Sequence, residues 1–174
     1  KALASSATRK VEGIIHSSEN PRLKVNLIDG GAKENIVRLL KSANCQINIL
    51  SIDSNAEEWL SDCDLIFLSN GPGDPAALSP VIEQIQKCLG KKPMVGICLG
   101  HQLLALALGA KTFKLPFGHR GANHPVSDTQ TGRVEISSQN HGFCVEAESL
   151  KASGAEVTHW NLNDNTVAGF VHRK

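Results

Sequence analysis

The sequence of 174 residues contains no run of about 20 apolar residues, so we expect no membrane-spanning helix. Its first ten residues, KALASSATRK, lack the apolar stretch that follows the charges of a signal peptide. Eighteen basic and 17 acidic residues leave a formal net charge of +1, and the basic residues are scattered. This balance favours neither nucleic acid nor a membrane surface as a partner. We find no internal repeat and no low-complexity segment.

The cysteines are few, odd in number and widely spaced, and no two of them form a C-x-x-C pair: Cys45, Cys63, Cys88, Cys98 and Cys144. This pattern argues against a disulfide framework or a zinc knuckle. It favours a reducing compartment, so we expect a cytoplasmic protein, with a plastid as the alternative.

What the sequence does contain is enough apolar material for a core, with 41% hydrophobic residues and 15 glycines. Candidate strands alternate with candidate helices, which predicts an α/β fold in three layers. A mostly parallel central sheet would carry helices on both faces. Its strands are expected at 23–28, 46–52, 65–68 and 93–97, and its helices at 34–43, 56–60, 79–89 and 99–108, with Ser79 as N-cap and Pro80 at the first helical position.

The pattern changes at both ends of this region. After Gly109, five short strands are expected at 111–115, 133–138, 143–146, 156–160 and 166–172, which predicts a mixed or antiparallel C-terminal part. Residues 1–22 show no clear period. We interpret them as a linker or the tail of a preceding domain, and 23–174 as the main domain.

One junction between a buried strand and a helix has the spacing of a nucleophile elbow. Gly96, Cys98 and Gly100 form Gly-x-Cys-x-Gly within MVGICLGHQ, with cysteine where hydrolases carry serine. A cysteine at a helix N-terminus gains stabilisation of its thiolate from the backbone N–H groups. The N–H of Leu99 would then face a developing oxyanion. The alternative is that Cys98 is a small buried hydrophobic residue in a glycine-rich turn.

A second loop, SNGPGDP at 69–75, follows another buried strand. Loops at the carboxyl ends of parallel strands form the ligand crevice of such sheets. The bare backbone of Gly71 can therefore supply a second oxyanion donor. The alternative is an ordinary Pro-Gly turn.

Together, SNGPGDP at 69–75 and GICLGHQLLALA at 96–107 resemble the class I, or triad-type, glutamine amidotransferases. FGHRGANHPV at 117–126 and QNHGFCV at 139–145 narrow the resemblance to the glutaminase subunits of carbamoyl-phosphate synthetases. The resemblance implies that Cys98 attacks the side-chain amide of glutamine, forms a thioester and releases ammonia and then glutamate. It assigns the oxyanion to backbone N–H groups of Leu99 and Gly71. The implied glutamine-binding residues are Gly71, Gly73, Leu99, Gln102, Asn140, Gly142 and Phe143.

The resemblance also implies a partner subunit and bears on which cofactors to expect. Ammonia would pass to a large synthetase subunit, which uses ATP and Mg, for arginine and pyrimidine synthesis. No cofactor is expected in this chain. No metal is expected either, because His119 and His124 lie in a glycine-rich stretch interpreted as a loop, without a carboxylate cluster. His101 lies on the wrong side of the elbow to be the base, and His141 receives no proton-transfer role.

The chain departs from the family in one respect: it contains no His-Pro-Glu, the motif that supplies the catalytic histidine and glutamate. The nearest string, NHPV at 123–126, belongs to another motif. We interpret this as truncation, and we interpret the family's N-terminal domain as absent too. Losing general acid–base catalysis costs about 10²–10⁴-fold, so we expect the 174-residue chain to be nearly inactive.

Three other functions stay open at this point. The chain could serve another synthase, of the anthranilate or aminodeoxychorismate type, which shares the Gly-Pro-Gly and cysteine elements. It could be a non-catalytic α/β binding module that keeps the elbow as architecture. It could also be a cysteine redox sensor of similar fold, which should form a sulfenic acid readily with peroxide.

Overall fold

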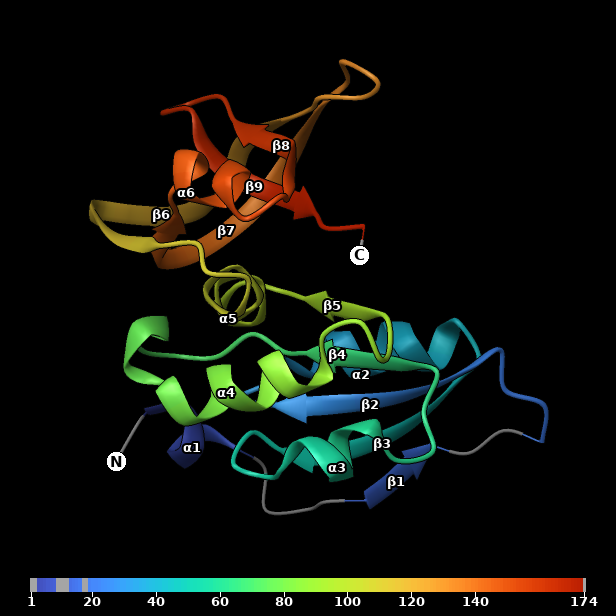
Figure 1. The fold of residues 1–174 in the computed structure, drawn as a ribbon. Coiled ribbons are helices and arrows are strands. Elements are labelled where there is room, and N and C mark those ends of the chain that lie inside the picture. Colours follow the sequence, from blue (N-terminus) through green and yellow to red (C-terminus); the bar gives the residue numbers. More distant parts are fainter. Residues whose placement is uncertain (1–2, 9–12, 17–18, 174) are drawn as a thin grey trace. The chain divides into compact units, whose positions relative to one another are not determined.

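The computed structural model describes residues 3–8, 13–16 and 19–173, and it divides the chain into two compact units, residues 1–104 and 105–174. The first unit is built on a five-stranded sheet in the order β1-β3-β2-β4-β5 (Figure 1). Strands β2 to β5 pair in parallel, and β1 pairs antiparallel with β3. The bounds are β1 Gly13–His16, β2 Leu23–Asp29, β3 Cys45–Ser51, β4 Leu65–Leu68 and β5 Met94–Gly96. The predicted mostly parallel sheet is confirmed.

Helices cover both faces of this sheet, as the alternation of β2 requires. Val25 and Leu27 pack with Val37 of α2 (Glu34–Ser42) in one core cluster. Asn26 points to the other face, where its Nδ2 donates to the Trp59 carbonyl of α3 (Ala56–Leu60) at 2.9 Å. The next helix, α4 (Ser79–Cys88), joins α3 on that side through a 3.1 Å hydrogen bond from the Ala56 N–H to a side chain of α4.

Two expectations for this unit need correction. The N-cap of α4 is Leu78, which makes no side-chain cap, and Ser79 is already helical. Strand β5 is not buried on both faces, because Val95 and Ile97 are 42% and 43% exposed. Residues 1–22, which show no clear period in the sequence, contain α1 (Leu3–Ala7) and β1, which is paired in the sheet. Whether they end a preceding domain stays a prediction.

The second unit is a four-stranded antiparallel sheet in the order β7-β6-β8-β9. Its core gathers Ala105, Val145, Leu150 and Val167. The predicted antiparallel C-terminal part is confirmed, but the strands are longer than expected. The stretch 117–126, interpreted as a loop, lies inside β6, and two expected strands are one strand, β7. The strands are β6 Thr112–Asp128, β7 Val134–Val145, β8 Glu156–Asn161 and β9 Thr166–Val171. The helices are α5 Leu99–Ala107 and α6 Ala147–Ala152, and the sequence did not predict α6.

The side chain of Asn26 offers a test of the first unit. Its Nδ2 donates to the carbonyls of Trp59 and Ser61, both at 2.9 Å, and its Oδ1 accepts from Asn48 at 3.1 Å. Asn26→Ala would leave these buried groups without partners, so we expect a loss of about 1–3 kcal/mol in the free energy of unfolding. Urea denaturation measures this. Exposed Asn35→Ala is the control and should stay within about 0.5 kcal/mol of the parent; equal losses would contradict the assignment.

Candidate active site

Cys98 occupies a strained turn between β5 and α5. Its φ is +54°, a left-handed conformation that a non-glycine residue rarely adopts. Backbone hydrogen bonds hold the turn against the end of β4: the Ile97 N–H donates to the Leu68 carbonyl at 3.1 Å, and the Gly100 N–H to the Ser69 carbonyl at 3.1 Å. Such strain costs about 1–3 kcal/mol and clusters at functional sites. The elbow predicted from the glycine spacing is therefore present.

Both flanking glycines are required by contact with backbone. A Cβ on Gly96 would overlap the backbone of Gly100, and a Cβ on Gly100 would overlap the carbonyl oxygen of Leu68. The first overlap would block the turn, and the second would push α5 away from β4. The half-buried Cys98 is the only cysteine of the five that is not buried.

Gly71 approaches the elbow from the end of β4. A Cβ on Gly71 would overlap the carbonyl oxygen of Gly30 and would lie 2.7 Å from Cδ2 of Leu99. The loop and the helix start are therefore in contact. None of the residues that the structure describes accepts a hydrogen bond from the Gly71 N–H. Its role as an oxyanion donor stays a prediction.

A further loop, 29–33, fixes the position of Gly71, and sequence reasoning missed it. Asn70 joins the two loops twice, since its Oδ1 accepts from the Lys33 N–H at 3.0 Å and its Nδ2 donates to the Gly31 carbonyl at 2.9 Å. The Gly30 N–H donates to Oγ of Ser69 at 3.0 Å. Asp29-Gly30-Gly31 directly follows the strand expected at 23–28, and nothing in the sequence pairs it with residues almost 40 positions later.

The same loop carries the charge that acts on Cys98. Burial raises the pKa of the Cys98 thiol above its ordinary value, while the Leu99 N–H and the Lys33 ammonium act in the opposite direction. The Leu99 N–H thus acts in the direction expected of a helix N-terminus, and burial outweighs it.

Two other predicted substrate residues belong to this unit. Gln102 lies one turn along α5, where its N–H donates to the Cys98 carbonyl at 3.1 Å. Its side chain is buried, with 5% of the residue exposed. Gly73 has a φ of +103°, and a Cβ there would lie 3.6 Å from Cβ of Leu3 in α1. The short helix α1 therefore packs against the Gly-Pro-Gly loop.

The remaining predicted glutamine contacts lie in the second unit, on β7. Asn140 pairs with Arg120 and Phe143 with Lys114 of β6. Gly142 stands between them with no atom within 4 Å of where a Cβ would be. Asn140 is exposed, whereas Phe143 is half-buried. Their role in binding stays a prediction.

The histidines of β6 and β7 gather rather than occupy a loop. The ring centroid of His119 lies 5.1 Å from that of His124 and 4.8 Å from that of His141. A carboxylate joins them, because Asp164 Oδ2 lies 2.7 Å from His119 Nε2. The sequence predicts no carboxylate cluster beside these histidines, and the structure places one carboxylate, Asp164, against His119. His101, beside the elbow, lies in the first unit, because α5 begins in that unit and ends in the second.

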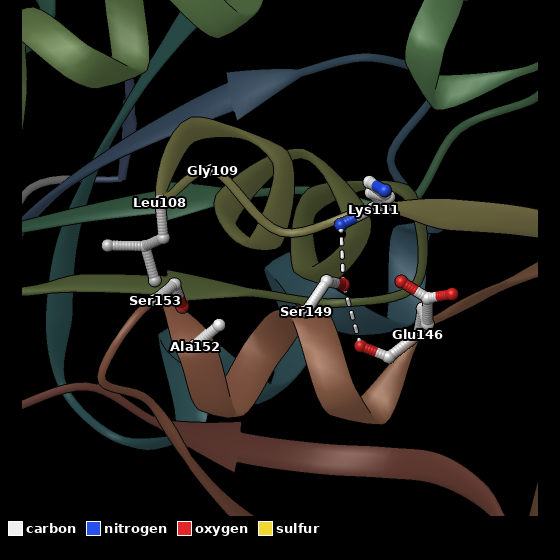
Figure 2. Close-up of a pocket in the computed structure, with 7 residues that line it drawn as sticks. All are labelled: Leu108, Gly109, Lys111, Glu146, Ser149, Ala152 and Ser153. Atoms are coloured by element: carbon white, nitrogen blue, oxygen red, sulfur yellow. Dashed lines mark hydrogen bonds between the residues drawn. The ribbon is translucent and has the colours of Figure 1, made fainter.

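A surface pocket in the second unit lies between α6 and the turn that follows α5 (Figure 2). Ser149 joins its two sides, accepting from the Lys111 N–H and donating to the Glu146 carbonyl, both at 2.9 Å. Its lining includes no predicted site residue.

No helix in the described part of the chain is long and apolar enough to cross a membrane.

Comparison with known proteins agrees with this geometry. The family model for class-I glutamine amidotransferases matches residues 26–174. The chain therefore belongs to the class-I glutamine amidotransferase family, whose elbow and Gly-Pro-Gly loop it carries.

Among curated proteins, the chain is 57% identical over 159 residues to the carbamoyl phosphate synthase small chain of Thermosynechococcus vestitus, covering 90% of this chain and 41% of that protein. It is 44% identical over 196 aligned positions to the carbamoyl phosphate synthase small chain of Listeria innocua, covering 100% of this chain and 54% of that protein. The chain thus spans about half, or less, of the length of these relatives.

Two solved structures share the fold. One is a putative GMP synthase component from Thermoplasma acidophilum, with a TM-score of 0.71 and 20% identity, covering 89% of this chain and 80% of that one. The other is a glutamine amidotransferase from Thermotoga maritima, also with a TM-score of 0.71 and 20% identity, covering 88% and 73%. The predicted α/β fold is confirmed.

The contact between Gly100 and Leu68 predicts the result of Gly100→Ala. The added methyl group would overlap the Leu68 carbonyl, so we expect a loss of about 1–3 kcal/mol in the free energy of unfolding. Gly90→Asn is the control, since Gly90 has a φ of +72° and open space around it, and asparagine tolerates that conformation. Chemical denaturation of both variants checks this, and a tolerated Gly100→Ala would contradict the close packing.

The raised pKa of Cys98 predicts slow alkylation at pH 7. Because burial disfavours the thiolate, we expect the iodoacetamide reaction at Cys98 to increase with pH through a midpoint above that of free cysteine. Lys33→Gln should move the midpoint higher, since the Lys33 charge lowers this pKa; Lys41→Gln is the control. Peptide mass spectrometry separates Cys98 from the other four cysteines. Alkylation at pH 7 faster than that of free cysteine would contradict the prediction.

Proposed function

We propose that the longer protein to which this chain corresponds hydrolyses glutamine to glutamate and ammonia through a thioester on Cys98. The observation that carries the proposal is the strained, half-buried cysteine at a helix start, with the Leu99 N–H beside its sulfur and Gly71 in contact with Leu99. A carbonyl carbon attacked by Cys98 develops negative charge on its oxygen. Two fixed backbone donors would stabilise that charge.

Release of ammonia needs a proton, and release of glutamate needs an activated water. A base must also remove the thiol proton, since burial raises the pKa of Cys98. Because the sequence has no His-Pro-Glu, we propose that the catalytic histidine and glutamate belong to the part of the protein beyond this chain.

Glutamine itself carries no net charge, so amide and backbone dipoles suffice to hold it. We propose Gly71, Gly73, Leu99 and Gln102 as contacts from the first unit. The family's motif also assigns Asn140, Gly142 and Phe143 to the amino-acid end of glutamine. The proposal is supported by the family's motifs, by the contact of Gly71 with Leu99 and by the hydrogen bond from the Gln102 N–H to the Cys98 carbonyl.

The relatives are carbamoyl phosphate synthase small chains, which supports a large synthetase subunit as the partner. We propose that the ammonia is delivered to a large synthetase subunit that uses ATP and Mg to make carbamoyl phosphate, in the cytoplasm. An amidotransferase for another synthase is the second candidate. Co-purification separates the two, because each predicts a different synthetase bound to the full-length protein.

A glutaminase assay tests the reaction. We expect the full-length protein to release glutamate at least about 100-fold faster than the 174-residue chain, because acid–base catalysis supplies about 10²–10⁴-fold. Cys98→Ser should abolish the full-length activity, while Cys63→Ser, at a buried cysteine outside the elbow, should retain it. Steady glutamate release by the 174-residue chain that is lost in Cys98→Ser would contradict the need for a missing base.

A further inference from the structure

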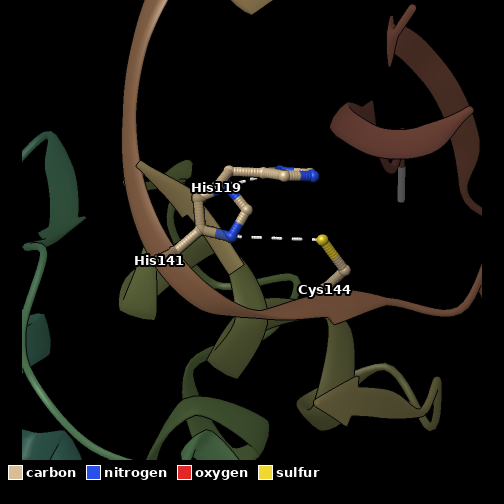
Figure 3. A group of neighbouring side chains, drawn as sticks. All are labelled: His119, His141 and Cys144. Atoms are coloured by element: carbon tan, nitrogen blue, oxygen red, sulfur yellow. Dashed lines mark hydrogen bonds between the residues drawn. The ribbon is translucent and has the colours of Figure 1, made fainter. Parts of the chain in front are cut away.

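A cluster of polar side chains in the second unit has more acceptors than donors at its centre. His119 comes from β6, His141 and Gln139 from β7, and Asp164 from the turn between β8 and β9. Nδ1 of His119 lies 3.3 Å from Nε2 of His141, which in turn lies 3.0 Å from Oε1 of Gln139. The planes of the two rings are nearly perpendicular, and Cys144 lies beside His141 (Figure 3).

In each ring, the nitrogen that faces away from the other ring donates a hydrogen bond: Nε2 in His119 and Nδ1 in His141. Nε2 of His119 lies 2.7 Å from the carboxylate of Asp164, which accepts only. Nδ1 of His141 lies 2.9 Å from the Phe143 carbonyl, which also accepts only. A neutral imidazole has one N–H, so the inner nitrogens of both rings carry lone pairs that point at one another.

The third acceptor is oriented by its own network. Oγ of Ser137 donates to the His124 carbonyl, so it accepts from Nε2 of Gln139 at 3.1 Å. Oε1 of Gln139 therefore points to the rings. Asn161 confirms this orientation, because its Oδ1 accepts from the Asn163 N–H and its Nδ2 donates to Oε1 of Gln139 at 3.3 Å.

Three acceptors therefore converge, and Nδ2 of Asn161 reaches Nδ1 of His119 only at 3.4 Å, longer than the usual 2.7–3.2 Å of a good hydrogen bond. A proton on Nε2 of His141 would serve Oε1 of Gln139 at 3.0 Å, but it would reach Nδ1 of His119 only at 3.3 Å. A metal ion between the rings would serve all three acceptors at once. Two zinc–nitrogen bonds of about 2.0–2.1 Å that meet at a tetrahedral angle place their nitrogens about 3.3–3.4 Å apart, which matches the observed spacing.

We propose that the second unit binds one divalent transition-metal ion of the zinc class between Nδ1 of His119 and Nε2 of His141, with Oε1 of Gln139 as the third ligand. The surroundings have the form that metal-bound histidines require, with a carboxylate on one outer nitrogen and a backbone carbonyl on the other. Zinc in such a site is usually four-coordinate, so a water would complete it. The ion would join β6 and β7 and, through Asp164, the β8–β9 turn.

Cys144 is close but stands outside this ligand set. Its sulfur approaches Nδ1 of His141, at 4.0 Å, the nitrogen that the Phe143 carbonyl already holds. One ligand atom from each of His119, His141 and Cys144 lies within 4.8 Å of the others. Cys144→Ser is therefore a matched control, because it alters a neighbour of the rings without removing a proposed ligand.

The test is titration of the metal-free 174-residue chain with Zn²⁺ against a chromophoric chelator, together with thermal unfolding. We expect one Zn²⁺ per chain and a higher melting temperature with Zn²⁺ than with Mg²⁺, which prefers oxygen ligands. His119→Asn and His141→Asn should each weaken binding at least tenfold. Asp164→Asn should weaken it about 10–100-fold, while Cys144→Ser and His172→Gln should change it less than threefold.

Circular dichroism of each metal-free variant separates loss of the site from loss of the fold. Asp164→Asn removes no proposed ligand, and its remaining side-chain oxygen can still accept from Thr166 as Oδ1 does, so it keeps the test decisive if a histidine variant fails to fold. Absence of stoichiometric Zn²⁺ binding would overturn the proposal in favour of a protonated His141. Equal binding by the His119→Asn, His141→Asn double variant would overturn it as well, and loss of binding in Cys144→Ser would refute the ligand set.

Discussion

The backbone hydrogen bonds between the end of β4 and the turn at Cys98 hold together everything proposed for the first unit. Ile97 and Gly100 donate to the carbonyls of Leu68 and Ser69. These bonds offset the cost of a left-handed cysteine and leave no space for a Cβ at Gly96 or Gly100. The position of the Cys98 sulfur and the strain in the Cys98 backbone are thus consequences of the hydrogen bonds at the end of β4.

The second constraint is the pairing of the two loops at the carboxyl ends of β2 and β4. Ser69 and Asn70 accept hydrogen bonds from the backbone of residues 30–33, and Asn70 also donates one to it. These bonds hold Gly71 in contact with Leu99. An oxyanion donor must be in place before the charge develops, because moving the donor during the reaction would raise the barrier and lower the rate. The loop pairing supplies this preorganisation with backbone and amide groups alone. Burial of the Cys98 thiol acts against this preorganisation, because it raises the pKa of the thiol and so disfavours the thiolate.

The sequence was sufficient for the elements whose signal is local. The buried runs of β2 and β4, the stripe of α2 and the glycine spacing around Cys98 predicted both the parallel sheet and the elbow. It was insufficient where a contact joins distant residues. Asn70 and Gly31, or His119 and Asp164, are about 40 positions apart, and each of them alone is typical of a turn or a surface.

The error at 117–126 has a related cause. Gly118, Gly121 and Pro125 are typical loop residues, yet β6 continues through them because bulges absorb the irregular positions while β7 pairs alongside. Pairing with a neighbour strand outweighed local propensity, which is weaker in strands than in helices. The same pairing brings His119 and His141 together, so the missed strand and the missed side-chain cluster are one error.

The most direct measurement of the central claim is a structure of the full-length protein labelled with a glutamine analogue that carries an electrophilic diazoketone. The account predicts a covalent bond to Sγ of Cys98, with the ketone oxygen accepting from the N–H groups of Leu99 and Gly71 at about 2.7–3.1 Å. A label on another cysteine, or a ketone oxygen that contacts neither N–H, would contradict it.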